Sequence, residues 1–374
     1  ETGALLWTKR ADLHRLARIT GAPTLTDDGR LYVPVASLEE VAGPIPDYEC
    51  CTFRGSVVAY DATTGEQLWK SYTIEGLKPT KKTSLGTQLW GPAGAGVWSA
   101  PTIDLRRLAL YVATGDAYTA PAADESDAVM AFDLDTGKRL WVKQLLENDA
   151  WLTNCEPDKP NRSETCPEKS GPDYDFGQSP ILRALPNGRS ILAIGQKSGV
   201  AWGLDPDKQG AVVWQHRVGK GSFLGGMEWG SAADERLAYF ANADGPLGPA
   251  DAGGLAALGL ATGERVWFTR PPPLKCGERD CVQAQSAAIT AIPGVVFSGT
   301  TNGIMRAYST EDGRVIWEYN TAQEYTTVNG VPAKGGAING PGPTVVGGTV
   351  FVTSGYGGLG GSGPGNVLLA FGVD

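Results

Sequence analysis

The sequence predicts an all-β fold built from four-stranded antiparallel sheets, and three observations support this prediction. The 374 residues include 51 glycines and 25 prolines spread along the chain, which is typical of turns between many short strands. One phrase recurs, in which a β-like run, a Thr-Gly or Asp-Gly turn and a second run carrying Trp follow one another. No strand alternates with an amphipathic helix of about 10–15 residues, which excludes a two-domain α/β chain.

The recurring phrase divides the chain at intervals of 50 to 73 residues. It is clearest at 57–69, 129–141, 255–267 and 304–317, and looser at 200–214. Each interval holds four short β-like runs, which in the first are RITGAPTL, GRLYVPV, GSVVAYD and EQLWKSY. Six such sheets arranged radially form a β-propeller. We expect one Trp per blade to pack between neighbouring blades rather than contact a ligand; these residues are Trp7, Trp69, Trp141, Trp214, Trp267 and Trp317.

The two ends of the chain carry complementary halves of the repeat. ETGALLW at 1–7 is the second half of the phrase, and NVLLAFGVD at 366–374 is the first half. A strand from the first residues would complete the last blade and remove an exposed sheet edge. The expected organisation is therefore a single propeller domain over residues 1–374 with six blade-equivalents.

Composition excludes several function classes. The formal charge of −9 argues against nucleic acid as a partner, because phosphate binding needs a basic face. The longest apolar runs are shorter than the ~18 residues of a membrane span. Two histidines leave no room for a His-rich zinc site, and no CxxC or CxxCH pattern predicts a zinc knuckle or attached haem.

The six cysteines form three close pairs, Cys50–Cys51, Cys155/Cys166 and Cys276/Cys281. An even count in short local loops predicts disulfides and therefore an oxidising compartment, periplasmic or secreted. Six free thiols in a cytosolic protein are the alternative, although such thiols are usually buried in strands rather than set in polar loops.

Four segments depart from the repeat and are the expected place for function. The first, at 31–55, contains Glu39, Cys50, Cys51 and Arg54, and the second, at 91–104, contains Trp98 after Gly-rich chain. The third and fourth place Asp116 at 111–119 and Lys197 at 195–200, each at the end of a β-like run; their sequences are YVATGDAYT and GQKSGV.

These segments resemble the pyrroloquinoline-quinone (PQQ) dependent quinoprotein alcohol dehydrogenases, and most of all the polyvinyl-alcohol dehydrogenase group. The resemblance covers nearly the whole chain and lies in the order of several segments; these are RITGAPTL, ASLEE, ECCTFRGSVVAYD, LWGPAGAGVW, ATGDAYT, DAVMAFDLDTGKRLW, GQKSGVAWGLDPDK and AINGPGPTVVGGTVFVTSGYGGLGG. The family fold is an eight-bladed propeller that holds PQQ beside Ca²⁺ or a lanthanide ion.

The resemblance implies roles for individual residues. Glu39 and Asp116 match the positions of metal ligands, with Asp116 where the family usually has Asn. Trp98 matches the indole on which the quinone stacks. Cys50–Cys51 would form the opposing wall.

Further matches concern the cofactor's charged groups and the base. Lys197 matches the cation beside the reactive carbonyl, and Arg54 and Thr20 are expected partners of the PQQ carboxylates. Asp149 is the candidate catalytic base, with a solvated loop aspartate as its alternative.

Three departures from the family pattern bear on the substrate. Leu152 replaces a second Asp in the phrase that carries the base, and Gly358-Leu359 replaces a glycine–tryptophan pair. Gln285 stands where methanol dehydrogenases carry another Trp. The last two changes predict a wider mouth over the quinone, which suits a substrate bulkier than methanol.

The resemblance implies an enzyme that oxidises secondary or polymeric alcohols such as polyvinyl alcohol. Electrons would pass to an external cytochrome c, because this sequence has no haem motif. The alternative is a noncatalytic propeller that acts as a binding or assembly scaffold. Six blade-equivalents against the family's eight favour a fragment that lacks N-terminal blades, and such a fragment could be inactive.

Overall fold

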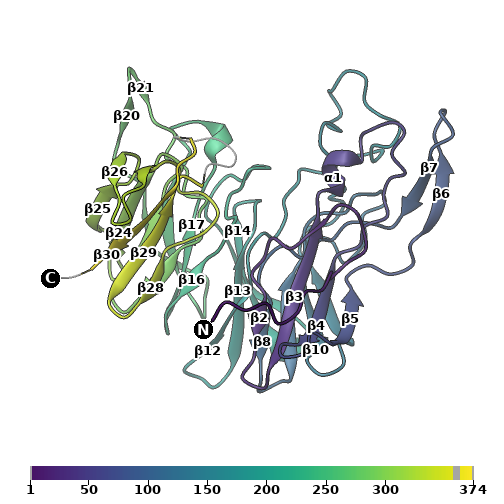
Figure 1. Cartoon of the computed structure of the whole chain (residues 1–374), viewed down its shortest axis with the longest axis horizontal. Coiled ribbons are helices and arrows are strands. Elements are labelled where there is room, and N and C mark those ends of the chain that lie inside the picture. Colours follow the sequence, from purple (N-terminus) through teal and green to yellow (C-terminus); the bar gives the residue numbers. More distant parts are fainter. Residues whose placement is uncertain (1, 357–362, 373–374) are drawn as a thin grey trace. The chain divides into compact units, whose positions relative to one another are not determined.

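A computed structural model describes residues 2–356 and 363–372 (Figure 1). Thirty strands account for nearly all of the regular structure in this part of the chain. The helical elements described are a single turn of α-helix, α1 (Glu39–Ala42), and the 3₁₀ segments η1 (Pro206–Lys208) and η2 (Gly245–Leu247). The prediction of an all-β chain is confirmed.

The chain forms two compact units. The first runs to Pro180 and includes Asp207–Ala211, and the second comprises Ile181–Pro206 and the chain from Val212 onward. None of the helices in the described ranges is long and apolar enough to cross a membrane.

The first unit contains two antiparallel sheets and one hairpin. The first sheet has the order β1-β3-β4-β5, with β2 also paired to β3, and the second has the order β11-β10-β9-β8. The strands are β1 (Ala17–Arg18), β2 (Thr24–Leu25), β3 (Arg30–Ser37), β4 (Ser56–Asp61), β5 (Gln67–Tyr72), hairpin β6 (Lys78–Lys82) and β7 (Gln88–Gly91), β8 (Thr102–Asp104), β9 (Ala109–Ala113), β10 (Ala128–Asp133) and β11 (Arg139–Gln144).

The second unit repeats the same meander. Three four-stranded sheets, one three-stranded sheet and two hairpins are described there. The four-stranded sheets are β12 (Ile181–Ala184), β13 (Ser190–Gly195), β14 (Val200–Asp205) and β15 (Ala211–Arg217); β16 (Ala232–Ala233), β17 (Leu237–Ala241), β18 (Leu255–Gly259) and β19 (Arg265–Thr269); and β22 (Thr290–Ile292), β23 (Val295–Gly299), β24 (Ile304–Ser309) and β25 (Val315–Asn320). The three-stranded sheet is β28 (Thr344–Val346), β29 (Thr349–Ser354) and β30 (Val367–Phe371), and the hairpins are β20 (Lys275–Cys276) with β21 (Arg279–Asp280) and β26 (Glu324–Thr326) with β27 (Pro332–Lys334).

Two expected strands differ in the structure. The run at 18–25 is interrupted at Gly21-Ala22-Pro23, so β1 and β2 pair separately with β3. A Cβ at Gly21 would lie 2.6 Å from the Ser99 carbonyl carbon, so this bend brings two backbones into contact. Residues 2–7, which the repeat predicts to be a strand, belong to none of the described sheets.

The middle strands of the sheets are buried on both faces. Five of the six residues of β4 are buried, as are all five of β9 and five of the six of β10. A core of Tyr32, Val57, Val112 and Met130 joins the two sheets of the first unit. Burial on both faces explains why these strands are continuous apolar runs rather than alternating ones.

Five of the repeat tryptophans each pack on a glycine of the next repeat; Trp141 packs on Gly210, and the other four also donate an indole N–H to a carbonyl there. A Cβ at Gly137 would lie 2.5 Å from the Trp69 ring, and Gly137 has φ of +70°. The Trp69 Nε1–H donates to the Leu134 carbonyl at 3.3 Å. The same arrangement joins Trp7 to Gly65, Trp214 to Gly263 and Trp267 to Gly313. The expectation that these tryptophans serve packing between sheets is confirmed for these five.

Gly137→Ala should destabilise the first unit by about 2–4 kcal/mol, because the new methyl group meets the Trp69 ring in a left-handed backbone conformation. Gly188→Ala is the matched control, since Gly188 has φ of +80° and a Cβ added there would meet nothing within 4 Å. This control should lose only the backbone strain of roughly 1 kcal/mol. Denaturant unfolding measures both, and equal losses would contradict the packing role.

Candidate functional site

Four connecting segments of the first unit lie side by side. The backbone of Gly94 forms bridges to Arg54 and Ala117, and Ala117 forms a bridge to Ala150. Gly94 has φ of +109°, and a Cβ there would lie 2.5 Å from the Tyr118 nitrogen. Only glycine allows this approach, so the Gly-rich chain before Trp98 serves to bring these segments together.

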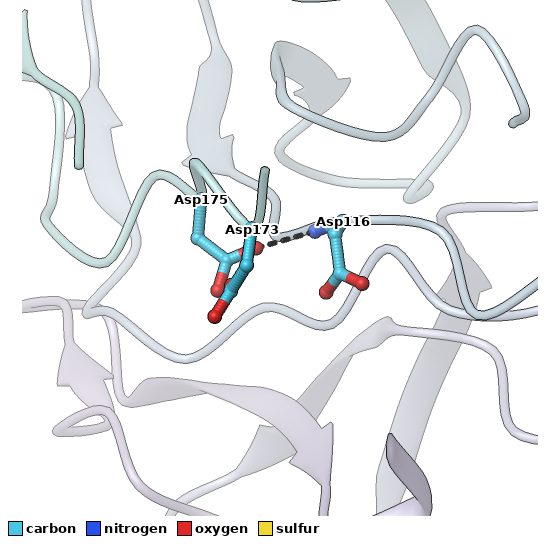
Figure 2. Close-up of side chains that lie close together, drawn as sticks. All are labelled: Asp116, Asp173 and Asp175. Carbon is cyan, nitrogen blue, oxygen red and sulfur yellow. Dashed lines mark hydrogen bonds between the residues drawn. The ribbon is translucent and has the colours of Figure 1, made fainter. Parts of the chain in front are cut away.

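A buried cluster of three carboxylates lies along these segments. Asp116 follows β9, whereas Asp173 and Asp175 lie in the connection that precedes β12, and the three offer oxygens within 4.8 Å of one another (Figure 2). Their side chains are 2%, 5% and 6% exposed. The Asp116 N–H donates to Asp175 Oδ1 at 2.6 Å, which ties the two segments together.

The charge of this cluster is the main feature of its electrostatics. Burial raises the pKa of Asp116 well above its usual value, and the charges of Asp175, Asp173 and Glu40 raise it further. Asp116 Oδ2 is buried and makes no hydrogen bond with the described residues. Buried carboxylates in mutual contact are stabilised by uptake of a proton or by a bound cation, and a ligand set made only of oxygens suits a hard ion such as Ca²⁺.

Asp149 positions the acidic loop. Its side chain is fully buried, and its two oxygens accept the N–H groups of Asp173 at 3.1 Å and Tyr174 at 2.7 Å. Gly171 packs against it so closely that a Cβ there would lie 2.1 Å from Asp149 Oδ1. Asp149 therefore lies beside the cluster, where its carboxylate holds the backbone that presents Asp173.

Glu39 lies within a separate hydrogen-bond network. Its carboxylate accepts from the Tyr48 hydroxyl at 2.8 Å and from the Thr52 and Phe53 N–H groups at 2.9 and 2.8 Å, and His14 Nε2 lies 3.3 Å away. Burial alone would raise its pKa, but His14 and the two N–H groups hold the pKa below its usual value. Glu39 does not belong to the three-carboxylate cluster, and it instead fixes the chain that follows Cys51.

Trp98 lies beside the acidic cluster. A Cβ at Gly115 would be 2.9 Å from Asp175 Oδ1 and 3.2 Å from Trp98 Nε1. The glycine next to Asp116 thus leaves the room that the indole and the carboxylate share. The structure places Trp98, Asp116 and Asp175 together around this position.

The cysteine pair lies in the apolar core of the same unit. Cys50 and Cys51 are 3% and 0% exposed, and Cys51 Sγ lies 4.0 Å from the Tyr118 carbonyl oxygen. A Cβ at Gly43 would lie close to both Cys50 Sγ and the Leu152 side chain, so Leu152 fills apolar space beside the disulfide. All three predicted disulfides are present.

Arg54 and Thr20 do not join the cluster. The Arg54 guanidinium lies over the Tyr72 ring, 3.8 Å from its centroid, and Nη1 donates to the Ile74 carbonyl at 3.4 Å. Thr20 is exposed between β1 and β2, and its side chain makes no hydrogen bond with the described residues. Their roles as partners of a cofactor remain predictions.

Lys197 lies in the second unit. It is 6% exposed in the turn after β13, and its carbonyl accepts the N–H groups of Ser222 at 3.2 Å and Gly226 at 2.8 Å. The turn that carries this cation is therefore fixed to the 222–226 segment.

Gln285, in the same unit, lies in a buried hydrogen-bond network. Its buried amide accepts from the Gly254 N–H and donates to Ser298 Oγ, each at 2.7 Å. The expectation that Gln in place of Trp at position 285 widens a mouth over the quinone stays a prediction. Gly358-Leu359 lies outside the described residues.

Sequence reasoning missed Asp173 and Asp175. They lie in a long polar connection without repeat character, where an aspartate is usually solvated. The Asp-x-Asp spacing shortly before a strand was the available indication, because alternate residues of extended chain point to one side.

Two family models match the chain. The model described as the β-propeller domain of glucose, ethanol and alcohol dehydrogenases matches residues 44–158, and the one described as outer membrane protein assembly factor BamB matches 126–362.

Relatives and solved structures are similar over nearly the whole chain. A polyvinylalcohol dehydrogenase of Pseudomonas sp. is 43% identical and one of Sphingopyxis sp. (strain 113P3) is 42% identical, each over 100% of this chain and 59% of the relative. The chain thus spans about three-fifths of the length of these relatives.

A structure of quinohemoprotein alcohol dehydrogenase ADHIIG from Pseudomonas putida HK5 matches with a TM-score of 0.65 and 18% identity, covering 94% of this chain and 58% of that one. A europium-containing methanol dehydrogenase matches with a TM-score of 0.62 and 19% identity over 94% and 68%. The fold is therefore a β-propeller fold.

Glu39→Gln should lower the free energy of unfolding by about 2 kcal/mol at pH 7, because an amide nitrogen would face the Thr52 or Phe53 N–H. The native pKa of Glu39 lies below its ordinary value of 4.5, so its stabilisation is present above pH 4.5 and is lost as the pH falls through the native pKa. The difference between variant and wild type should shrink on acidification. Glu66→Gln on an exposed turn is the control, and a difference independent of pH would contradict this role.

Terbium(III) should bind the Asp116–Asp173–Asp175 cluster, with luminescence sensitised by excitation of the nearby Trp98 indole. Asp116→Asn should weaken binding by at least about tenfold, because it removes one of three anionic ligands. Trp98→Phe should reduce the luminescence while competition with Ca²⁺ still reports binding. Asp124→Asn, at an exposed residue, should leave both signals unchanged, and equal affinity of Asp116→Asn and wild type would contradict the site.

Proposed function

Because the chain belongs to the PQQ-dependent quinoprotein alcohol dehydrogenase family, we propose that it serves the oxidation of alcohols, secondary or polymeric ones such as polyvinyl alcohol. The observation that supports this most directly is the buried carboxylate cluster beside Trp98. A propeller that only packs sheets has no use for three such groups, which oppose folding unless a cation compensates them.

The residues present fit a metal ion and a flat quinone. Asp116 Oδ2 is a buried acceptor without a hydrogen bond, and Asp173 and Asp175 complete an all-oxygen ligand set for Ca²⁺ or a lanthanide ion. Gly115 leaves space where a side chain would meet both Trp98 and Asp175. Trp98 would offer a stacking face, the Cys50–Cys51 disulfide an opposing wall, and Arg54 and Thr20 contacts to carboxylates.

The proposed chemistry assigns the proton to the chain's own carboxylates. When bound, PQQ supplies the hydride acceptor for the carbinol carbon. We propose Asp149 as the group that accepts the hydroxyl proton, because the Asp173 and Tyr174 N–H groups hold its carboxylate beside the cluster. Lys197 is proposed as the cation that stabilises developing negative charge, a role supported by the family resemblance.

The electron acceptor and the compartment follow from the same proposal. We propose an external cytochrome c as acceptor and a periplasmic or secreted location. The three disulfides, Cys50–Cys51, Cys155–Cys166 and Cys276–Cys281, support an oxidising compartment.

The second candidate function is a noncatalytic scaffold. The match of residues 126–362 to the BamB model favours it, because that model describes an assembly factor. The scaffold has no need of the Asp116 cluster or of Trp98 beside it. Retention of PQQ by the folded chain therefore discriminates between the two functions.

The chain incubated with PQQ and Ca²⁺ or a lanthanide ion should retain PQQ through gel filtration and reduce an artificial dye with 2-propanol. Asp149→Asn should lower kcat by at least about 100-fold, since it removes the proton acceptor. Asp124→Asn should retain the full rate. If the wild-type chain neither retains PQQ nor reduces the dye, the proposal is overturned in favour of a scaffold.

A further inference from the structure

A pocket of about 420 Å³ lies wholly within the second unit. Its size falls in the range of about 300–1,000 Å³ that is usual for small-molecule sites. The lining residues come from five connecting segments and η2, and they are mainly apolar; they include Phe223, Leu224, Trp229, Pro246, Val282 and Tyr356. Its lining residues all belong to the second unit, whereas the Asp116 cluster belongs to the first unit.

Few polar side chains line the pocket, and Glu228 is the acidic one among the described residues. Ser286 Oγ donates to Asn339 Oδ1, and both side chains are buried. The Asn339 Nδ2 amide, whose residue lines the pocket, makes no hydrogen bond with any described residue. Glu228 adds one carboxylate that is 7% exposed.

The charge of the lining excludes one class of ligand. No Lys, Arg or His of the described residues lines this pocket, and the acidic residue in its lining is Glu228. An anionic ligand, a tricarboxylate such as PQQ included, would find no counter-charge there. The pocket suits a neutral ligand with an apolar frame and hydroxyl groups.

The pocket is open to solvent along its apolar rim. Phe223 is 50% exposed, Val282 37% and Tyr356 63%. A chain longer than the pocket can therefore leave it over these side chains. Large apolar side chains gathered at such an opening mark a binding surface.

The pocket is connected to the turn that carries Lys197. The Gly226 N–H donates to the Lys197 carbonyl at 2.8 Å, and the Met227 N–H donates to the Gln196 carbonyl at 3.2 Å. The 223–229 segment that forms one wall is thus fixed to the residue proposed to assist the chemistry.

We propose that this pocket binds non-reacting repeat units of a neutral polyhydroxylated hydrocarbon chain, an inference that rests on the proposed alcohol oxidation. The methylene groups would lie on Phe223, Trp229 and Tyr356. Asn339 Nδ2 would donate to one chain hydroxyl, and Ser286 Oγ would accept from another. A site of this kind favours long polyalcohols over single short alcohols, because each added unit buries further apolar surface.

The test is direct binding of short vinyl-alcohol oligomers to the full chain, measured by calorimetry and by the fluorescence of Trp229 and its neighbours. The oligomers should bind, while poly(ethylene glycol), which has few hydroxyl groups, and poly(acrylic acid), which is anionic, should bind at least about tenfold more weakly. Asn339→Leu should weaken oligomer binding about tenfold, as should Phe223→Ala. Asn329→Leu and Leu140→Ala, at exposed residues outside the pocket, are the matched controls.

Binding is read without PQQ, so this result is separate from the proposed activity. PQQ retention and dye reduction with 2-propanol, measured on the same preparations, report the alcohol oxidation and should be unchanged in the control Leu140→Ala. Circular dichroism confirms that each variant is folded. Oligomer affinity that is equal in wild type, Phe223→Ala and Asn339→Leu would overturn the pocket even if alcohols are oxidised, as would equal affinity for poly(ethylene glycol).

Discussion

The packing of an indole on a glycine is the contact on which the sheets of each unit depend. Trp69, Trp214 and Trp267 each lie on the turn glycine of the following repeat and donate a hydrogen bond beside it. The contact needs a residue that has no side chain and that adopts a left-handed backbone conformation, and glycine meets both requirements. It holds the turns at one end of the sheets, and the connections at the other end are left to carry chemistry.

The acidic cluster shows how those connections are organised without regular structure. Gly94 and Gly171 allow close approach of two backbones, since a Cβ at Gly94 would lie 2.5 Å from the Tyr118 nitrogen and one at Gly171 2.6 Å from the Asp149 Cα. Asp149 anchors the loop that presents Asp173. Three buried carboxylates lie close together there, at a cost in stability that a bound cation would offset. The second unit places a different kind of site on the same scaffold, with apolar walls and the neutral Asn339.

Much of the fold could be predicted from the sequence, because the Trp and Gly of each repeat form the same packing contact between neighbouring repeats. The turns, most strands and the three local disulfides follow from that repeat and from Cys spacing. The continuous strand expected through Gly21 was wrong, because a local pattern cannot show that Ser99 packs against this bend. Asp116 was found since it ends a strand, whereas Asp173 and Asp175 were missed since their connection has no period. Glu39 and Gln285 were singled out by residue type, whereas the backbone N–H groups that they accept from could not be recognised in the sequence.

The Cys155–Cys166 disulfide has a consequence for the order of the acidic loop. Asp149 and Asp173 are 24 positions apart, and the disulfide closes 11 of these into a loop of their own. Fewer free dihedral angles then separate the anchor from the group that it holds, so less conformational entropy is lost when they meet. Arg162 hydrogen-bonds to the Cys155 carbonyl and to Ser170 across this loop, which narrows its freedom further. The oxidised state of this cysteine pair thus becomes part of what keeps the carboxylates preorganised.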